Sequence, residues 1–228
     1  MARRLLAVAV LVLLVLPAPA TDPPRVVREN IEWLDVWVPG NEVKGRPRIL
    51  LIGDSITRGY YGEVEKRLQE KALVARLTTS KSAGDPGLLA EVDLVLAQTK
   101  FDVVHFNNGL HGWGYSDDEY ARALPDLLAA IRKGAPGAKL IWASTTPVRE
   151  ADKLDQLSSK TERVKARNEA AAALMAREKV PTDDLFGLVK DHPEWHGRDG
   201  VHFNGQGTAA LGEQVADHLL HLLQDTRK

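Results

Sequence analysis

Short apolar runs alternate with longer amphipathic segments along most of this chain. The runs at residues 49–52, 73–77, 102–106 and 139–142 are typical of strands buried on both faces. Helical spacing or composition marks residues 60–71, 88–97, 117–133, 158–178 and 208–223, with Pro125 predicting a kink or a new first turn. Residues 185–189 are either a short last strand or the stretch that follows one. This alternation predicts βαβ units, a parallel sheet and helices on both of its faces.

The first twenty residues have the pattern of a secretory signal peptide. Arg3 and Arg4 precede an apolar run at residues 5–16, and small residues lead to a cleavage position after Ala20. The run is shorter than the ~20 residues of a spanning helix, so we expect no stable membrane anchor after cleavage. We therefore expect a secreted or periplasmic bacterial protein. Residues 21–46 form a predicted lead-in whose Trp33 and Trp37 pack against the main domain, residues 47–228.

Composition removes several classes of function. The 228 residues include 30 Lys and Arg against 31 Asp and Glu, a balance that argues against nucleic acid as the main partner. The chain has no Cys, which excludes disulfides, Cys-ligated metals and thiol catalysis. A protein exported without Cys is also more typical of bacteria than of eukaryotic secretion. The remaining chemistry uses Ser, His, carboxylates or a hard metal.

Polar residues follow the predicted strands at the positions where parallel sheets carry their sites. Ser55 comes directly after the first strand, in the sequence Gly-Asp-Ser-Ile-Thr, and Gly84 lies in the loop after the second. Residues 107–112 follow the third strand, and Asp199 and His202 precede the last helix. Because the carboxyl ends of parallel strands share one edge, these loops are expected to meet there.

Ser55, His202 and Asp199 form a candidate catalytic set. A serine hydroxyl needs a base within hydrogen-bond reach in order to attack, and the base needs a group that orients it. Asp199 lies three residues before His202, which allows the carboxylate to hold the imidazole while the ring faces Ser55. The backbone N–H groups of Ser55 and Gly84 are candidate donors to an oxyanion. Asp54 is interpreted as a structural carboxylate that fixes the turn.

These motifs resemble the first and last conserved blocks of the SGNH, or GDSL-type, hydrolases, and the resemblance covers residues 49–228. It implies a three-layer α/β/α, flavodoxin-like fold and an esterase or lipase activity. It also implies Ser55 as nucleophile, His202 as base, Asp199 as third member and Gly84 as an oxyanion donor. In the third block the family's Asn donor is replaced: a gapless match places His111 there, and Asn107 or Asn108 takes the role if the loop shifts.

The sequence therefore predicts an exported serine esterase that hydrolyses small-molecule or saccharide esters, with short acyl groups such as acetyl, and that needs no cofactor. An acyltransferase acting on cell-envelope saccharides would use the same residues. A non-catalytic carbohydrate-binding relative is favoured only by the replaced Asn. A metal site formed by His192, His196, Asp199 and His202 is disfavoured, because Pro193 and Gly197 interrupt a regular helix. The oligomeric state stays open.

Overall fold

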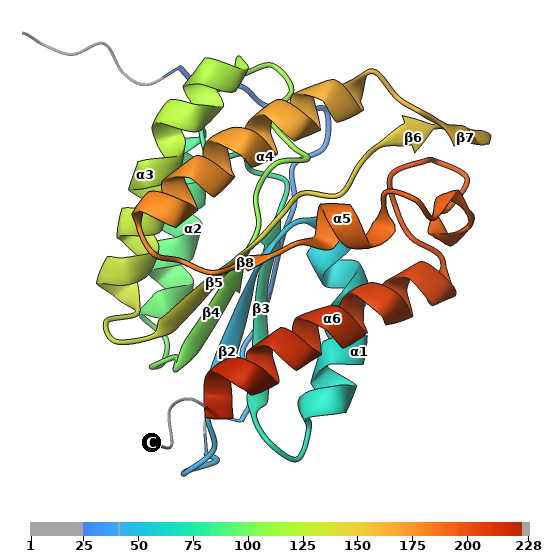
Figure 1. Cartoon of the computed structure of the whole chain (residues 1–228). Helices are drawn as coiled ribbons and strands as arrows, with labels where there is room; N and C mark the ends of the chain where they lie inside the picture. The colour runs from blue at the N-terminus through green and yellow to red at the C-terminus, as the bar shows by residue number, and fades with distance from the viewer. Residues whose placement is uncertain (1–24, 41, 225–228) are drawn as a thin grey trace, which may run out of the picture.

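A computed structural model describes residues 25–40 and 42–224 and shows a mixed six-stranded sheet covered by helices on both faces (Figure 1). Its strand order is β1-β3-β2-β4-β5-β8. The five parallel strands are β2 (Arg48–Gly53), β3 (Leu73–Thr79), β4 (Val103–Phe106), β5 (Lys139–Ala143) and β8 (Thr182–Asp183). Numbered among themselves along the chain, they follow the flavodoxin-like order 2-1-3-4-5. The predicted α/β/α fold with a central parallel sheet is confirmed.

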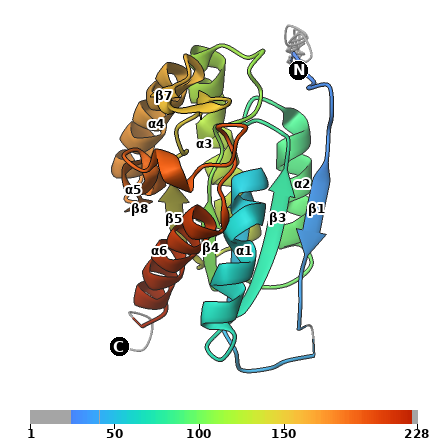
Figure 2. The ribbon, with the colours of Figure 1, turned by 90° about the vertical axis from the view of Figure 1, so that its right-hand side faces the viewer.

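The helices form one layer on each side of the sheet (Figures 1 and 2). One layer contains α1 (Ser55–Leu68), the short α5 (Leu185–Val189) and α6 (Gly205–Gln224). The other contains α2 (Pro86–Leu96), α3 (Asp117–Gly134) and α4 (Lys160–Arg177). Strand β2 supplies both cores by alternation, with Ile49 and Leu51 on the α1 side and Leu50 and Ile52 on the other. Within the described residues, no helix is long and apolar enough to cross a membrane.

Polar caps start several helices at the carboxyl edge of the sheet. The Asp54 carboxylate accepts a hydrogen bond from the Ile56 backbone N–H and caps α1. Asp85 caps α2 in the same way through Gly87 N–H. Each of these carboxylates caps a helix that begins within a few residues of the end of a strand, so hydrogen bonds fix the short loops at this edge.

The lead-in adds a strand that the sequence pattern did not predict. Strand β1 (Leu34–Trp37) pairs antiparallel with β3 at the edge of the sheet. Trp33 packs against the body as expected, with Arg58 over its ring. The same expectation for Trp37 is wrong, because 52% of its surface is exposed on the edge strand.

Other differences concern short elements. The apolar residues 185–189 are helix α5, the stretch that follows the last strand, because Asp184 accepts from Gly187 N–H and caps a helical turn. Helix α3 continues through Pro125 to Gly134. A hairpin of β6 (Arg149–Glu150) and β7 (Lys153–Leu157) and a 3₁₀ helix η1 (Pro193–Trp195) were also not predicted. The predicted signal peptide, residues 1–20, lies outside the described residues.

Candidate active site

The loop after β2 presents Ser55 at the first position of α1. Asp54 precedes it and is almost fully buried, which confirms that this carboxylate fixes the turn. Burial raises the pKa of Asp54 above its usual value, and the charge of His111, the next largest influence, acts to lower it. The charge of His202 acts in the same direction as that of His111. Both histidines therefore lie within electrostatic range of the residue next to Ser55.

Ser55, His202 and Asp199 form one hydrogen-bonded chain. Nε2 of His202 lies 2.9 Å from Oγ of Ser55, and Nδ1 of His202 lies 2.6 Å from Oδ2 of Asp199. A carboxylate only accepts hydrogen bonds, so the shared proton belongs to Nδ1 and Nε2 is free to accept the Ser55 hydroxyl proton. This geometry can activate a serine hydroxyl.

The Asp199 carboxylate also forms hydrogen bonds within the loop that carries it and His202. Oδ1 of Asp199 accepts from the backbone N–H groups of Val201 and His202 at 2.9 Å each. Partial burial acts to raise the pKa of Asp199, but the hydrogen bonds from the His202 ring and from these two N–H groups outweigh it and lower the pKa. The carboxylate is thus held in its ionised form, the form that orients the imidazole.

Backbone hydrogen bonds connect the β6–β7 hairpin to the loop that carries Asp199 and His202. Arg149 N–H donates to the Gly200 carbonyl at 2.7 Å, and Asp152 N–H donates to the Arg198 carbonyl at 2.9 Å. Gly200 has φ of +72°, and a Cβ there would meet the Arg149 carbonyl oxygen at 2.2 Å. Only glycine satisfies both conditions without displacing the loop.

Two backbone N–H groups are candidates for binding an oxyanion. Within the described part of the chain, neither Ser55 N–H nor Gly84 N–H donates to a protein acceptor. Gly84 lies against the ring of Tyr115, where a Cβ would approach Cδ1 of the ring to 3.1 Å. The glycine thus allows close packing of the loop after β3, in addition to its free N–H.

The two asparagines of the third loop, the loop that follows β4, form side-chain hydrogen bonds to other parts of the protein. Asn108 accepts from Ala83 N–H at 2.8 Å and donates to the Lys81 carbonyl at 2.9 Å. Asn107 donates to the Ala143 carbonyl at 2.7 Å and to the Thr145 hydroxyl. Asn108 therefore ties the loops after β3 and β4 together with Oδ1 and one N–H of its side-chain amide.

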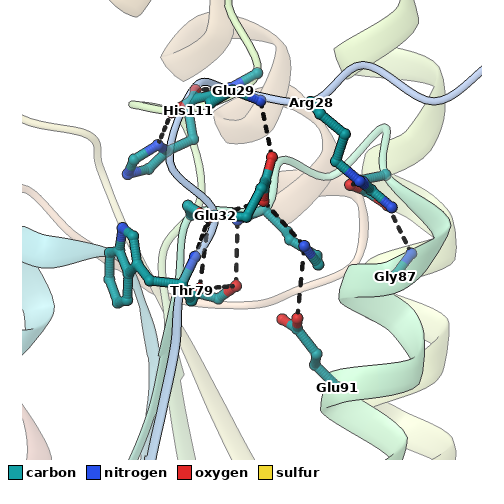
Figure 3. A network of polar contacts seen from close by, with 12 residues as sticks. Arg28, Glu29, Glu32, Thr79, Gly87, Glu91 and His111 are labelled. Atoms are coloured by element: carbon teal, nitrogen blue, oxygen red, sulfur yellow. Dashed lines mark hydrogen bonds and ion pairs between the residues drawn. The ribbon is translucent and has the colours of Figure 1, made fainter.

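His111 lies in a different environment. Its Nδ1 is 2.8 Å from Oε2 of Glu29 in the lead-in, and its ring meets Trp33 edge-on at 6.2 Å between centroids (Figure 3). Within the described residues, no protein group bonds its Nε2. His111 therefore has one ring nitrogen that bonds no protein group in the described part of the chain.

Two residues of this site were missed by the sequence reasoning. Glu29 lies far from the motifs in sequence, and nothing in a Pro- and charge-rich lead-in marks it. Arg167 of α4 is fully buried, and its guanidinium donates to the carbonyls of Gly109, His111 and Gly112 at 2.8 to 3.1 Å. Five donors in a fixed fork let one arginine hold the whole turn. Because α4 contains several Lys and Arg residues, the sequence does not show which of them is buried.

The histidines considered for a metal site make other contacts. His192 stacks on Trp195 and pairs with Glu194, while His196 packs against Phe203. No group of three or more His, Asp or Glu side chains within the described residues could hold a metal ion.

Comparison with known proteins agrees with this fold. The profile of the GDSL-like Lipase/Acylhydrolase family matches residues 51–210. The native aryl esterase of M. smegmatis is 18% identical, with TM-score 0.64 over 77% of this chain and 99% of that one. Est24, a carbohydrate acetylesterase from Sinorhizobium meliloti, is 17% identical, with TM-score 0.63 over 78% and 100%. A carbohydrate esterase family 3 protein from Talaromyces cellulolyticus is 18% identical, with TM-score 0.63 over 78% and 99%.

A search of curated proteins finds no significant match. The family profile nevertheless spans most of the chain, including the loops after β2, β3 and β4 and the residues before α6. The chain belongs to the GDSL-like lipase/acylhydrolase family and is a carboxylic ester hydrolase of the α/β class.

Proposed function

We propose that this protein is an exported serine esterase in which Ser55 is the nucleophile, His202 the general base and Asp199 the group that orients the base. The observation that carries the proposal is the continuous hydrogen-bonded chain from Ser55 Oγ through both nitrogens of His202 to Asp199. Family membership supports ester hydrolysis as the reaction.

The reaction follows from the proton positions. Ser55 Oγ attacks the ester carbonyl carbon while Nε2 of His202 takes the hydroxyl proton. The tetrahedral intermediate collapses, the bond to the alcohol oxygen breaks, and His202 returns the proton to the leaving alcohol. Water then attacks the acyl-enzyme, again losing a proton to His202, and the acid leaves as Ser55 recovers its proton. Asp199 stabilises the imidazolium in both halves.

The negative charge on the intermediate needs donors. Ser55 N–H, Gly84 N–H and Nε2 of His111 are the proposed set. Within the described residues none of these three groups bonds a protein partner, which supports the proposal. Asn108 is the alternative donor: it holds the loops through Oδ1 and one amide N–H, and its NH₂ group has a second N–H.

Short acyl esters of saccharides are the proposed substrates. The side chains of His202 and Asp199 are 52% and 53% exposed, so a bulky alcohol can reach the serine without entering a deep pocket. Two structural neighbours of this fold bear names that describe carbohydrate esterases, which favours the same substrate class here. Export is part of the proposal, and the exported protein should begin near Thr21, as N-terminal mass analysis can test.

The test is a panel of esters with Ser55→Ala as its control. p-Nitrophenyl acetate, butyrate and octanoate report acyl length, and an acetylated xylan reports the saccharide. We expect acetate release to be fastest and Ser55→Ala to lower kcat by about 10⁴–10⁶-fold. Hydrolysis that survives in Ser55→Ala would refute the proposal. Adding acceptor saccharides to the same assay distinguishes hydrolysis from acyl transfer.

A further inference from the structure

The structure contains a second histidine–carboxylate pair, formed by His111 of the loop after β4 and Glu29 of the lead-in. Glu29 Oε2 lies 2.8 Å from Nδ1 of His111, and Glu29 Oε1 accepts from the Gly112 backbone N–H, also at 2.8 Å (Figure 3). The Glu29 carboxylate thus forms hydrogen bonds with both the ring and the backbone of the same turn. Neither Glu29 nor the pair is part of the Ser55–His202–Asp199 chain.

The two pairs share one geometry but must serve opposite tasks. In both, a carboxylate contacts Nδ1, so the proton of that contact belongs to the ring. For His202 this leaves Nε2 as an acceptor, which is what a base for Ser55 requires. For His111 a neutral ring with the same tautomer would also present an acceptor, and an acceptor repels an oxyanion. His111 can donate from Nε2 only when both ring nitrogens carry protons.

We infer that His111 acts as an imidazolium that donates from Nε2 to the oxyanion, and that Glu29 is the positioning residue whose carboxylate holds the ring and balances its charge. This inference rests on the proposed function, because it assigns the charge state of one of its donors. A charged donor forms a stronger hydrogen bond than a neutral amide, so the arrangement favours the transition state in particular.

The charges around His111 are compatible with a cationic ring. Glu29 faces it from the lead-in, and Asp54 lies within electrostatic range from the start of α1. The Arg167 guanidinium from α4 donates to the carbonyl oxygens of His111 and of its neighbours, and its Nε lies 3.4 Å from Asp117 Oδ1, a carboxylate that offsets its charge. Arg58 of α1 stacks on Trp33, with 4.5 Å from its Cζ to the ring centroid, and Trp33 in turn meets the His111 ring edge-on.

The position of Glu29 is fixed by the lead-in around it. Its backbone N–H donates to Glu32 Oε1 at 2.8 Å, and Glu32 Oε2 accepts from Lys81 Nζ at 3.0 Å (Figure 3). Arg28 forms an ion pair with the buried Asp85 that caps α2. A lead-in anchored on both sides of residue 29 gives this carboxylate a defined place, as a positioning residue requires.

The test is the pH profile of kcat/KM for p-nitrophenyl acetate, measured in the wild type and in variants. The wild type should give a bell-shaped profile, because the inference requires a neutral His202 and a protonated His111 at the same time. In Glu29→Gln the amide oxygen can accept from Gly112 N–H while the amide NH₂ donates to Nδ1 of His111. That exchange moves the ring proton to Nε2, so a neutral ring can donate.

In Glu29→Gln, kcat/KM should therefore no longer fall at alkaline pH. Its maximum should be about tenfold lower than in the wild type, because the donor is no longer charged. His111→Asn, which supplies a neutral amide donor, should likewise show no fall of kcat/KM at alkaline pH. His111→Ala should lose about 10²–10³-fold in kcat. Glu91→Gln, a control that removes a carboxylate from the same network without contacting His111 or Glu29, should keep the wild-type bell.

Nitrogen-15 NMR of the His111 ring in Ser55→Ala supplies a readout that does not depend on hydrolysis. We expect both ring nitrogens protonated at neutral pH with Glu29 present, and a neutral Nε2–H ring in Glu29→Gln. A neutral His111 in the first protein, or an alkaline limb unchanged in Glu29→Gln and His111→Asn, would overturn the inference. If Ser55→Ala instead keeps its activity, the proposed function is what fails.

Discussion

Gly200 shows how one residue controls the loop that holds Asp199 and His202. Its φ of +72° disfavours any residue with a side chain, and a Cβ there would lie only 2.2 Å from the Arg149 carbonyl oxygen. Gly200→Ala should lower the free energy of unfolding by about 1–3 kcal/mol and move His202 away from Ser55, so that kcat falls at least tenfold. Urea unfolding and p-nitrophenyl acetate kinetics measure the two effects.

Gly205→Ala is the matched control for this prediction. Gly205 starts α6, and a Cβ there meets nothing within 4 Å, so both quantities should stay near the wild type. Equal effects of the two substitutions would show that the β6–β7 hairpin does not constrain the loop.

At the residue scale, the sequence predicts what is local and misses what is long-range. Ser55 and the pair Asp199 and His202 are visible because each lies in a short motif at the end of a predicted element. Glu29 contacts a ring 82 positions away, and no spacing rule connects the two. The side-chain hydrogen bonds of Asn108 also depend on how two loops meet, so the sequence alone does not predict them.

Among the elements, helix α4 determines the shape of the third loop through Arg167. This guanidinium is fully buried and serves three carbonyls, and burial lowers its pKa. Arg167→Met would leave those carbonyls without donors, so we expect a loss of about 3 kcal/mol in the free energy of unfolding and a lower kcat. Denaturant unfolding and ester kinetics test both expectations.

Arg163 offers a comparison one turn earlier on α4. It also bonds two carbonyls, those of Trp113 and Tyr115, but its side chain is 33% exposed and water can replace it. Arg163→Met should cost about 1 kcal/mol or less and leave kcat within a few-fold. If the two arginines prove equivalent, α4 does not act on the site through Arg167.

The elements that the sequence predicts well are those with a repeating pattern. Buried strands such as β2 and long helices such as α4 have enough residues for their periodicity to be read. Strand β1 exposes Trp37 and exists because β3 offers it a free edge. Strand β8 has two residues, and the β6–β7 hairpin is stabilised by the loop it supports, so neither has a local signal.

At the scale of the whole molecule, Asp183 joins three parts of the fold. Its side chain is fully buried in β8 and contacts His105 of β4 at 3.2 Å and both Gln214 and His218 of α6, at 2.7 and 3.0 Å. Burial acts to raise the pKa of Asp183, but hydrogen bonding to His105 and Gln214 and the histidine charges outweigh it, so the pKa is lowered. The ionised carboxylate therefore stabilises the folded state.

Asp183→Asn should lower the free energy of unfolding by about 2–3 kcal/mol at pH 7. A depressed folded-state pKa gives stability that is complete above the unfolded value of about 3.9 and is lost as the pH falls through the folded value. The difference between wild type and variant should thus shrink in strongly acidic solution. Urea unfolding across this range measures it, and a difference independent of pH would show that the charge of Asp183 does not contribute.

The proposed function depends above all on one serine of this molecule being a nucleophile that His202 activates. Labelling with a fluorophosphonate probe, followed by intact-mass and peptide-mass analysis, reports that chemistry without any choice of ester substrate. We expect a single adduct per chain, on Ser55, that is absent from Ser55→Ala and strongly slowed in His202→Ala. An adduct on another residue, or a folded wild-type protein that hydrolyses esters and takes up no label, would contradict this assignment.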